Sequence, residues 1–171
     1  MLNIWGFMGS GKSTLGRYVA QVYQWKHIDS DERIEQAEGL SIPELFARYG
    51  ESYFRQKETD FLARLVRDQQ ESDAEPFTVL TTGGGMPLRE ENRHYLRQLG
   101  PSVYLHVSFE EIIRRLAQDD QRPLWNEREL AKMKQRYHER LSIYRTADHI
   151  IEADHYTVAQ VAEQLKNVIR A

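Results

Sequence analysis

Short apolar runs alternate with longer amphipathic stretches along the chain. The apolar runs are rich in β-branched or aromatic residues, as β-strands are, and they lie at 2–5, 27–28, 77–80, 103–107 and 149–151. The stretches between them are longer and place apolar residues on one side of a helix. Strands that alternate with helices are typical of a parallel sheet with helical crossovers, so the pattern predicts an α/β fold.

The amphipathic stretches predict helices at 14–23, 51–70 and 128–145. In the first of these, Leu15, Val19 and Val22 are spaced to share one side. Three more helix starts have a capping box, in which a hydroxyl caps the helix and an acid or amide three residues later reaches back. These pairs are Ser41 with Glu44, Ser108 with Glu111, and Thr157 with Gln160.

The length of 171 residues fits one compact domain with a buried core, and we expect residues 1–171 to form it. No repeat or low-complexity linker interrupts the pattern. The polar stretch 118–126, which contains Pro123, predicts an exposed loop of a length suited to a mobile lid.

The overall charge argues against a nucleic acid as partner. The formal net charge is -3 and the isoelectric point is about 6.1, whereas nucleic-acid binders normally have a basic excess. The absence of cysteine excludes disulfides and thiolate metal sites. The first residues lack the features of a signal peptide, and no apolar run approaches the roughly 18 residues needed to cross a membrane. We therefore expect a cytoplasmic protein with no membrane partner.

The most specific pattern is a phosphate-binding loop at 6–13. Gly6, Gly11, Lys12 and Ser13 satisfy G-x-x-x-x-G-K-[ST], between an apolar strand and a predicted helix. In such loops backbone N–H groups point at phosphate oxygens, the lysine reaches the β- and γ-phosphates, and the hydroxyl ligates Mg²⁺. Chance produces the pattern in on the order of one chain in a hundred of this length. We therefore expect a site for ATP or a similar nucleotide.

The loop alone does not choose between a kinase, a GTPase switch and a motor ATPase. The guanine-reading motif N-K-x-D is absent, and motor or transporter ATPases are normally longer. A short chain with a second cluster of charged residues favours a kinase for a small metabolite or nucleotide.

Two carboxylates follow the second predicted strand. Asp29 and Asp31, at i and i+2, point the same way if the backbone is extended, so both can face the nucleotide site. The alternative is that Asp31 only caps a helix over 32–37. Arg55 and Glu58 are three apart on a predicted helix and can pair, although such a pair is by itself more typical of an exposed surface.

Glycines and arginines complete the second cluster. Gly83, Gly84 and Gly85 follow the strand at 77–80, where a ligand can approach the backbone closely; the alternative is a flexible turn. Arg122 lies in the predicted lid loop and Arg140 on the helix after it; the alternative for both is an arginine in solvent.

Taken together, these segments resemble the shikimate kinase family. The resemblance rests on G-F-M-G-S-G-K-S-T, D-S-D, G-E with F-R, T-T-G-G-G, R-P-L and R-L-S-I-Y-R, and runs from Gly6 to Arg145. It implies a three-layer αβα fold around a five-stranded parallel sheet, with a substrate-binding segment at about 31–62 and a lid at about 114–127. It also implies a monomer that phosphorylates the 3-hydroxyl of shikimate, with ATP and Mg²⁺, in the biosynthesis of chorismate and the aromatic amino acids.

The resemblance implies a role for each matching residue. At the nucleotide it places Gly9, Ser10, Gly11, Lys12, Ser13 and Thr14, with Arg115 against the adenine and Arg122 on the transferred phosphoryl group. Mg²⁺ is expected on Ser13 and Asp29. Arg55 and Arg140 are expected to bind the shikimate carboxylate, with the backbone of Gly83, Gly84 and Gly85 against the ring. Asp31 is expected to accept the proton of the attacking hydroxyl, which makes Lys12, Asp31 and Arg122 the expected catalytic residues.

Two positions depart from the family pattern. Trp5 stands where a small aliphatic residue is expected in the first strand, and Trp125 follows R-P-L where a second leucine is usual. Neither position has an assigned polar role.

Three alternatives remain open. Gluconate kinases share the phosphate loop but not the D-S-D, F-R and G-G-G set. A nucleotide kinase of the adenylate type needs a larger acceptor pocket, whereas a pair of arginines suits a small carboxylate. An inactive relative that only binds a partner is expected to lack a site residue, and every residue of the set is present here.

Overall fold

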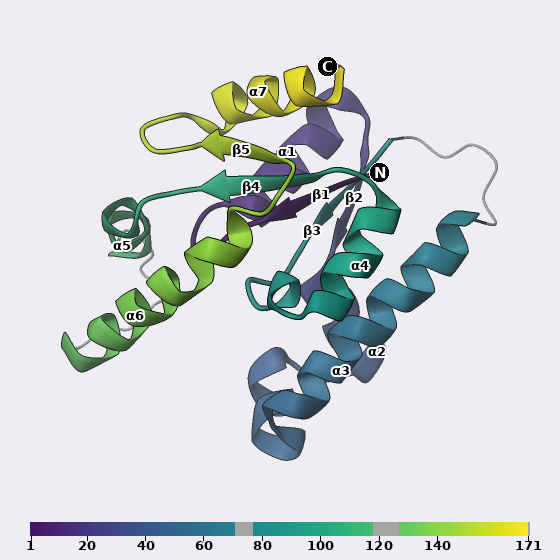
Figure 1. Ribbon diagram of the computed structural model, residues 1–171, viewed down its shortest axis with the longest axis vertical. Helices are drawn as coiled ribbons and strands as arrows, with labels where there is room; N and C mark the ends of the chain where they lie inside the picture. Colours follow the sequence, from purple (N-terminus) through teal and green to yellow (C-terminus); the bar gives the residue numbers. More distant parts are fainter. Residues whose placement is uncertain (71–76, 118–126, 171) are drawn as a thin grey trace.

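A five-stranded parallel sheet lies at the centre of the molecule (Figure 1). This computed structural model describes residues 1–70, 77–117 and 127–170. The strands are β1 (Leu2–Trp5), β2 (Lys26–Asp29), β3 (Thr78–Thr81), β4 (Ser102–His106) and β5 (His149–Glu152), in the order β2-β3-β1-β4-β5. Because every neighbouring pair is parallel, the carboxyl ends of all five strands meet at one edge. Ligands of open parallel sheets bind at that edge, where the strand order reverses beside β1.

Helices cover both faces of the sheet. They are α1 (Lys12–Tyr23), α2 (Ser30–Glu38), α3 (Ile42–Gln70), α4 (Glu90–Leu99), α5 (Phe109–Ala117), α6 (Glu127–Tyr144) and α7 (Val158–Arg170), with a 3₁₀ turn η1 (Met86–Leu88). Figure 1 shows α1 and α7 packed together on one face and α3 beside α4 on the other. The three-layer αβα prediction is therefore confirmed, whereas the predicted lid loop 118–126 lies outside the described residues. None of the described helices combines the length and apolar character that a membrane span needs.

Element boundaries follow from local backbone chemistry. Gly11 has φ 92°, and α1 begins directly after it, two residues earlier than predicted. Gly50, with φ 80° and ψ 170°, interrupts α3, so the predicted helix over 51–70 is its second part. Of the three residues predicted to share one side of α1, Leu15 and Val19 are buried, whereas Val22, one residue before the end of that helix, is 50% exposed.

The capping boxes are formed to different degrees. Ser41 and Glu44 pair at the start of α3, and Thr157 and Gln160 form both reciprocal hydrogen bonds before α7. At α5 only half of the box forms. The Ser108 hydroxyl accepts from the Glu111 N–H at 3.3 Å, but the Glu111 carboxylate bonds two arginines instead.

The apolar core fills the space between the sheet and its helices, and the unexpected Trp5 belongs to it with 2% exposed. Its indole N–H donates to Oδ1 of Asn3 at 2.6 Å, and Asn3 Nδ2 in turn donates to the backbone oxygen of Leu96. A buried indole N–H needs such a partner, and Asn3 supplies it from the same strand face. A second, smaller cluster, the α2–α3 core, consists of Ile34, Leu45 and Phe54.

Candidate functional site

The phosphate-binding loop joins β1 to α1 at the carboxyl edge of the sheet. Gly9 and Gly11 have φ values of 77° and 92°, a region that favours glycine, and this curls the backbone ahead of the α1 amino end. Lys12, the first residue of α1, is only 8% exposed, and its Nζ donates to the backbone oxygen of Phe7 at 2.9 Å. Burial lowers the pKa of Lys12 to about 8, although Asp31 and Asp29 oppose this shift. A buried ammonium group with few partners is suited to bind an anion.

Ser13 and Asp29, both expected at Mg²⁺, lie within hydrogen-bond distance of each other. Ser13 Oγ donates to Asp29 Oδ2 at 2.6 Å, and Thr81 Oγ1 donates to the same oxygen at 2.9 Å. Thr81 is bonded in turn to Nε2 of His27 at 2.9 Å. Burial opposes ionisation, but the Ser13 and Thr81 hydroxyls and two backbone N–H groups outweigh it and lower the pKa of Asp29. The result is a fixed, ionised carboxylate beside the loop serine.

The helix cap after β2 is Asp29 and not Asp31. Asp29 Oδ1 accepts from the N–H groups of Asp31 and Glu32, so α2 begins at Ser30 and the backbone is not extended through 31. The interpretation of Asp31 as a mere cap is therefore wrong. Its Oδ1 is buried without a hydrogen-bond partner among the described residues. Burial, with help from the charge of Asp29, raises the pKa of Asp31 to about 6.

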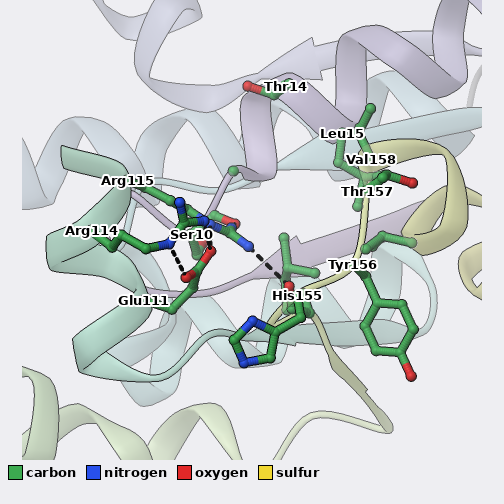
Figure 2. A pocket seen from close by; sticks show the side chains of 14 residues that line it. Ser10, Thr14, Leu15, Glu111, Arg114, Arg115, His155, Tyr156, Thr157 and Val158 are labelled. Carbon is green, nitrogen blue, oxygen red and sulfur yellow. Dashed lines mark hydrogen bonds and ion pairs between the residues drawn. The ribbon is translucent and has the colours of Figure 1, made fainter. Parts of the chain in front are cut away.

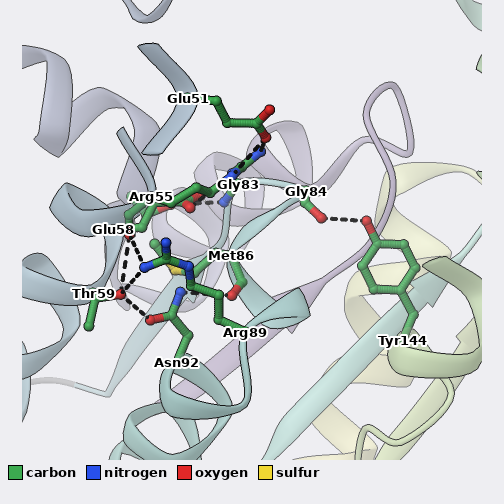
Figure 3. A network of polar contacts seen from close by, with 11 residues as sticks. Glu51, Arg55, Glu58, Thr59, Gly83, Gly84, Met86, Arg89, Asn92 and Tyr144 are labelled. Carbon is green, nitrogen blue, oxygen red and sulfur yellow. Dashed lines mark hydrogen bonds and ion pairs between the residues drawn. The ribbon is translucent and has the colours of Figure 1, made fainter. Parts of the chain in front are cut away.

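Arg55 lies against the glycine segment, defined here as Gly83–Gly85 (Figure 3). Its guanidinium bonds Glu51 and Glu58, each at 2.9 Å, and Glu58 is fully buried, so this is no ordinary surface pair. Burial raises the pKa of Glu58 to about 7 against the opposing effect of Arg55.

The glycine segment is enclosed by the other predicted acceptor residues. A Cβ on Gly83 would lie 2.4 Å from Oδ1 of Asp31, one on Gly84 would lie 3.5 Å from Nη1 of Arg140, and one on Gly85 would lie 2.2 Å from Nη1 of Arg55. Gly83 and Gly85 therefore have no room for a side chain, whereas a Cβ on Gly84 would only make contact with its neighbours. The interpretation as a merely flexible turn is wrong.

Beside the phosphate loop, a cleft of about 370 Å³ opens between α1, α5 and the start of α7 (Figure 2). Ser10, Gly11, Thr14 and Arg115, all predicted at the nucleotide, line it. Arg115 is fixed there, because its guanidinium donates to the Glu111 carboxylate and to the backbone oxygens of Ser10 and Ala153 at 2.8 to 3.0 Å. The paired arginines lower the pKa of Glu111 to about 2.

The structure brings most predicted site residues into one continuous region. The carboxyl ends of β1, β2 and β3 are surrounded by the glycine segment and by Lys12, Ser13, Asp29, Asp31, Arg55 and Arg140. Gly9 instead packs against α5, near Ile112 and Leu116. Arg122 lies outside the described residues, as does Trp125.

Sequence reasoning missed several residues of this region. Glu111, His155, Tyr156 and Thr157 also line the cleft, and Thr81 fixes Asp29. The Ser30 hydroxyl accepts from the N–H of Gly83 at 2.8 Å, and the Tyr144 hydroxyl donates to the backbone oxygen of Gly84. Two of these residues could have been found from the sequence, because Thr81 belongs to the T-T-G-G-G motif and Tyr144 to the R-L-S-I-Y-R motif.

Comparison with known proteins agrees with this geometry. The family model for shikimate kinase matches residues 8–170. The chain is 37% identical over 172 residues to the shikimate kinase of Sulfurihydrogenibium sp. (strain YO3AOP1), with 99% of each chain covered. It is 43% identical over 150 residues to that of Neisseria meningitidis serogroup C (strain 053442), which covers 86% of this chain and 84% of the relative.

A solved structure shows the same fold. The shikimate kinase from Acinetobacter baumannii in complex with shikimate superposes with a TM-score of 0.84 at 33% identity, covering 99% of this chain and 92% of that one. Because the family model matches residues 8–170 of 171, the chain belongs to the shikimate kinase family.

Proposed function

We propose that this chain transfers the γ-phosphoryl group of ATP to the 3-hydroxyl of shikimate through the residues described above. The observation that carries the proposal is the position of Asp31. It is a half-buried carboxyl whose buried Oδ1 has no hydrogen-bond partner among the described residues, and both Lys12 at the phosphate loop and Arg55 beside the glycine segment act on its pKa. A group between the two ends of a two-substrate site is suited to the acceptor hydroxyl.

At the donor end, the loop N–H groups and Lys12 hold the β- and γ-phosphates, and the cleft beside Arg115 takes the base and ribose. Phosphoryl transfer depends mainly on positioning and on neutralising charge, so a pre-fixed lysine and a curled loop supply much of what is needed. Arg122 is proposed to add a positive charge at the transferred group.

Ser13 and Asp29 fit a magnesium ion at this end. Mg²⁺ in kinases usually takes one or two protein ligands and completes its shell with water and phosphate oxygens. When bound, the ion would neutralise phosphate charge. Asp29, itself bonded by Thr81, accepts from the Ser13 hydroxyl and so fixes the two groups side by side.

At the acceptor end, Arg55 and Arg140 bind the shikimate carboxylate, since a planar guanidinium pairs with a carboxylate through two hydrogen bonds. The glycine backbone bounds the ring. Asp31 accepts the proton of the 3-hydroxyl as its oxygen attacks the γ-phosphorus. The new O–P bond forms while the bond from the γ-phosphorus to the bridging oxygen of ADP breaks.

The test is an ADP-release assay with shikimate, quinate, gluconate and AMP as separate acceptors. We expect turnover with shikimate well above that with the other three. ADP release with shikimate at the background rate would reject the proposal, and preferred turnover of gluconate would favour the alternative kinase.

A further inference from the structure

A buried polar chain joins α3 to the segment that follows β3 (Figure 3). The Thr59 hydroxyl on α3 donates to Oδ1 of Asn92 on α4 at 2.7 Å, and Asn92 Nδ2 donates to the backbone oxygen of Met86 at 2.9 Å. Thr59 is 3% exposed and Asn92 is fully buried. Because these groups are shielded from solvent, each depends on the others as its hydrogen-bond partner.

Arg89, directly after η1, adds a second link to the same helix. Its Nη1 donates to the backbone oxygen of Arg55 at 3.3 Å and to Oγ1 of Thr59 at 3.5 Å. The Thr59 hydroxyl itself lies 3.2 Å from that backbone oxygen. The turn of α3 that contains Arg55 and Thr59 is therefore bonded to two side chains from the next elements.

The linked elements are the ones that supply the acceptor end. Met86 directly follows Gly85, and Thr59 lies one helical turn after Arg55. The clearance between Arg55 and the glycine backbone is small, since a Cβ on Gly85 would lie 2.2 Å from Nη1. How α3 sits against η1 therefore sets the distance from the guanidinium to the glycine backbone.

We propose that Asn92 and Thr59 are positioning residues for the acceptor, which they do not touch. They hold Arg55 and the glycine segment at the spacing that one small carboxylate-bearing ring requires. The inference rests on the proposed function of Arg55 and of the glycine segment. It predicts a selective effect, because the nucleotide end is built from the phosphate loop, α1 and α5, which the chain of hydrogen bonds does not reach.

Thr59→Val tests the proposal with little change of shape, since it replaces only the hydroxyl. We expect the KM for shikimate to rise about three- to tenfold, the equivalent of one net hydrogen bond, with the KM for ATP within twofold of wild type. Thr59→Ser keeps the hydroxyl and should restore most of the acceptor KM. Calorimetric titration of shikimate without nucleotide should show the same loss of affinity.

Leu96→Val is the matched control, because Leu96 lies one turn after Asn92 on α4, is equally buried, and has a side chain that packs in the apolar core. Thermal unfolding should show that both valine variants fold. An acceptor KM for Thr59→Val within twofold of wild type would overturn the proposal. So would an equal rise in the ATP KM, or an equal acceptor effect in Leu96→Val.

A measurement without substrate separates this inference from the proposed function. The backbone amide shifts of Gly83, Gly84, Gly85 and Met86 in the free protein should change in Thr59→Val and return in Thr59→Ser. Unchanged shifts would overturn the positioning role whatever the acceptor is. Failure of the wild-type protein to phosphorylate shikimate would instead reject the proposed function.

Discussion

At the scale of single residues, Asp31 is held where ionisation is unfavourable. Its Oδ1 is buried without a partner among the described residues, and Asp29 adds repulsion. The folded protein therefore binds a proton at this carboxyl more tightly than the unfolded chain does. Above a pH of about 6 the ionised carboxylate costs its full amount of stability. The cost shrinks as the pH falls below that value and disappears below the unfolded pKa of 3.8, where both states are protonated.

We predict that Asp31→Asn raises the stability of the protein while it removes activity. At pH 7.5 the variant should be about 1–3 kcal/mol more stable, and the difference should shrink by pH 4.5. Turnover should fall by about a hundredfold or more. Denaturant unfolding at both pH values, with the ADP-release assay, checks this.

Asp148→Asn is the control of opposite sign. Ser102 donates to Asp148 from its N–H and its hydroxyl, and these bonds lower the pKa of Asp148. Loss of the Asp148 carboxylate should lower the stability of the protein at pH 7.5, and the difference from wild type should be smaller at low pH. A destabilised Asp31→Asn protein at pH 7.5 would contradict the account of Asp31.

Gly85 gives a second prediction at this scale. Its φ of -90° is open to any residue, so Gly85→Ala should fold, but its Cβ would meet the Arg55 guanidinium. Displacement of Arg55 should raise the KM for shikimate about tenfold to a hundredfold and leave the ATP KM unchanged. Gly84→Ala, whose Cβ meets neighbours only at 3.4–3.5 Å, should have the smaller effect in the same steady-state assay. The reverse order would refute this reasoning.

At the scale of elements, α5 fixes one wall of the nucleotide cleft. Glu111 bonds Arg114 and Arg115, and Arg115 reaches across to Ser10 in the phosphate loop and to Ala153 after β5. One helix therefore joins the two loops between which the cleft lies (Figure 2).

We predict that Glu111→Gln raises the KM for ATP about three- to tenfold without changing that for shikimate, because Arg115 loses its charged partner. The exposed neighbour Glu110, changed to Gln, should leave both constants as they are. Calorimetry should show weaker nucleotide binding by Glu111→Gln than by Glu110→Gln. Equal affinities in the two variants would disprove the role of Glu111.

The kinds of element could be predicted from the sequence, because apolar periodicity reports directly which side of a strand or helix is buried. The strand order β2-β3-β1-β4-β5 could not, since it depends on pairing between distant segments. The site residues were found through the shared motifs. The cap at Asp29 was missed because spacing does not show where a strand ends. The burial of Glu58 was missed because it depends on how α3 packs in the folded chain.

At the scale of the whole molecule, the buried apolar side chains are unevenly distributed. The α2–α3 core contains three buried apolar side chains, Ile34, Leu45 and Phe54, whereas the main core spans the sheet and most helices. Regions with few buried apolar contacts open more readily than the rest.

We predict that amide hydrogens in 34–48 exchange with solvent at least about tenfold faster than those of β1 and β3. Leu45→Ala should accelerate exchange in 34–48 and leave the protection of the strands nearly unchanged. Hydrogen exchange followed by mass spectrometry resolves the two regions, and uniform protection would show that they open together.

The place of Trp5 has a practical consequence. Trp5 directly precedes Gly6 and its buried indole bonds Asn3, whereas Trp25 lies at the opposite, amino end of β2 and contacts Tyr23 and Phe77. One tryptophan is thus next to the phosphate loop and another is remote from it. In a Trp25→Phe, Trp125→Phe protein, intrinsic fluorescence would come from Trp5 alone, so nucleotide binding could be followed in real time without a dye or a coupled enzyme.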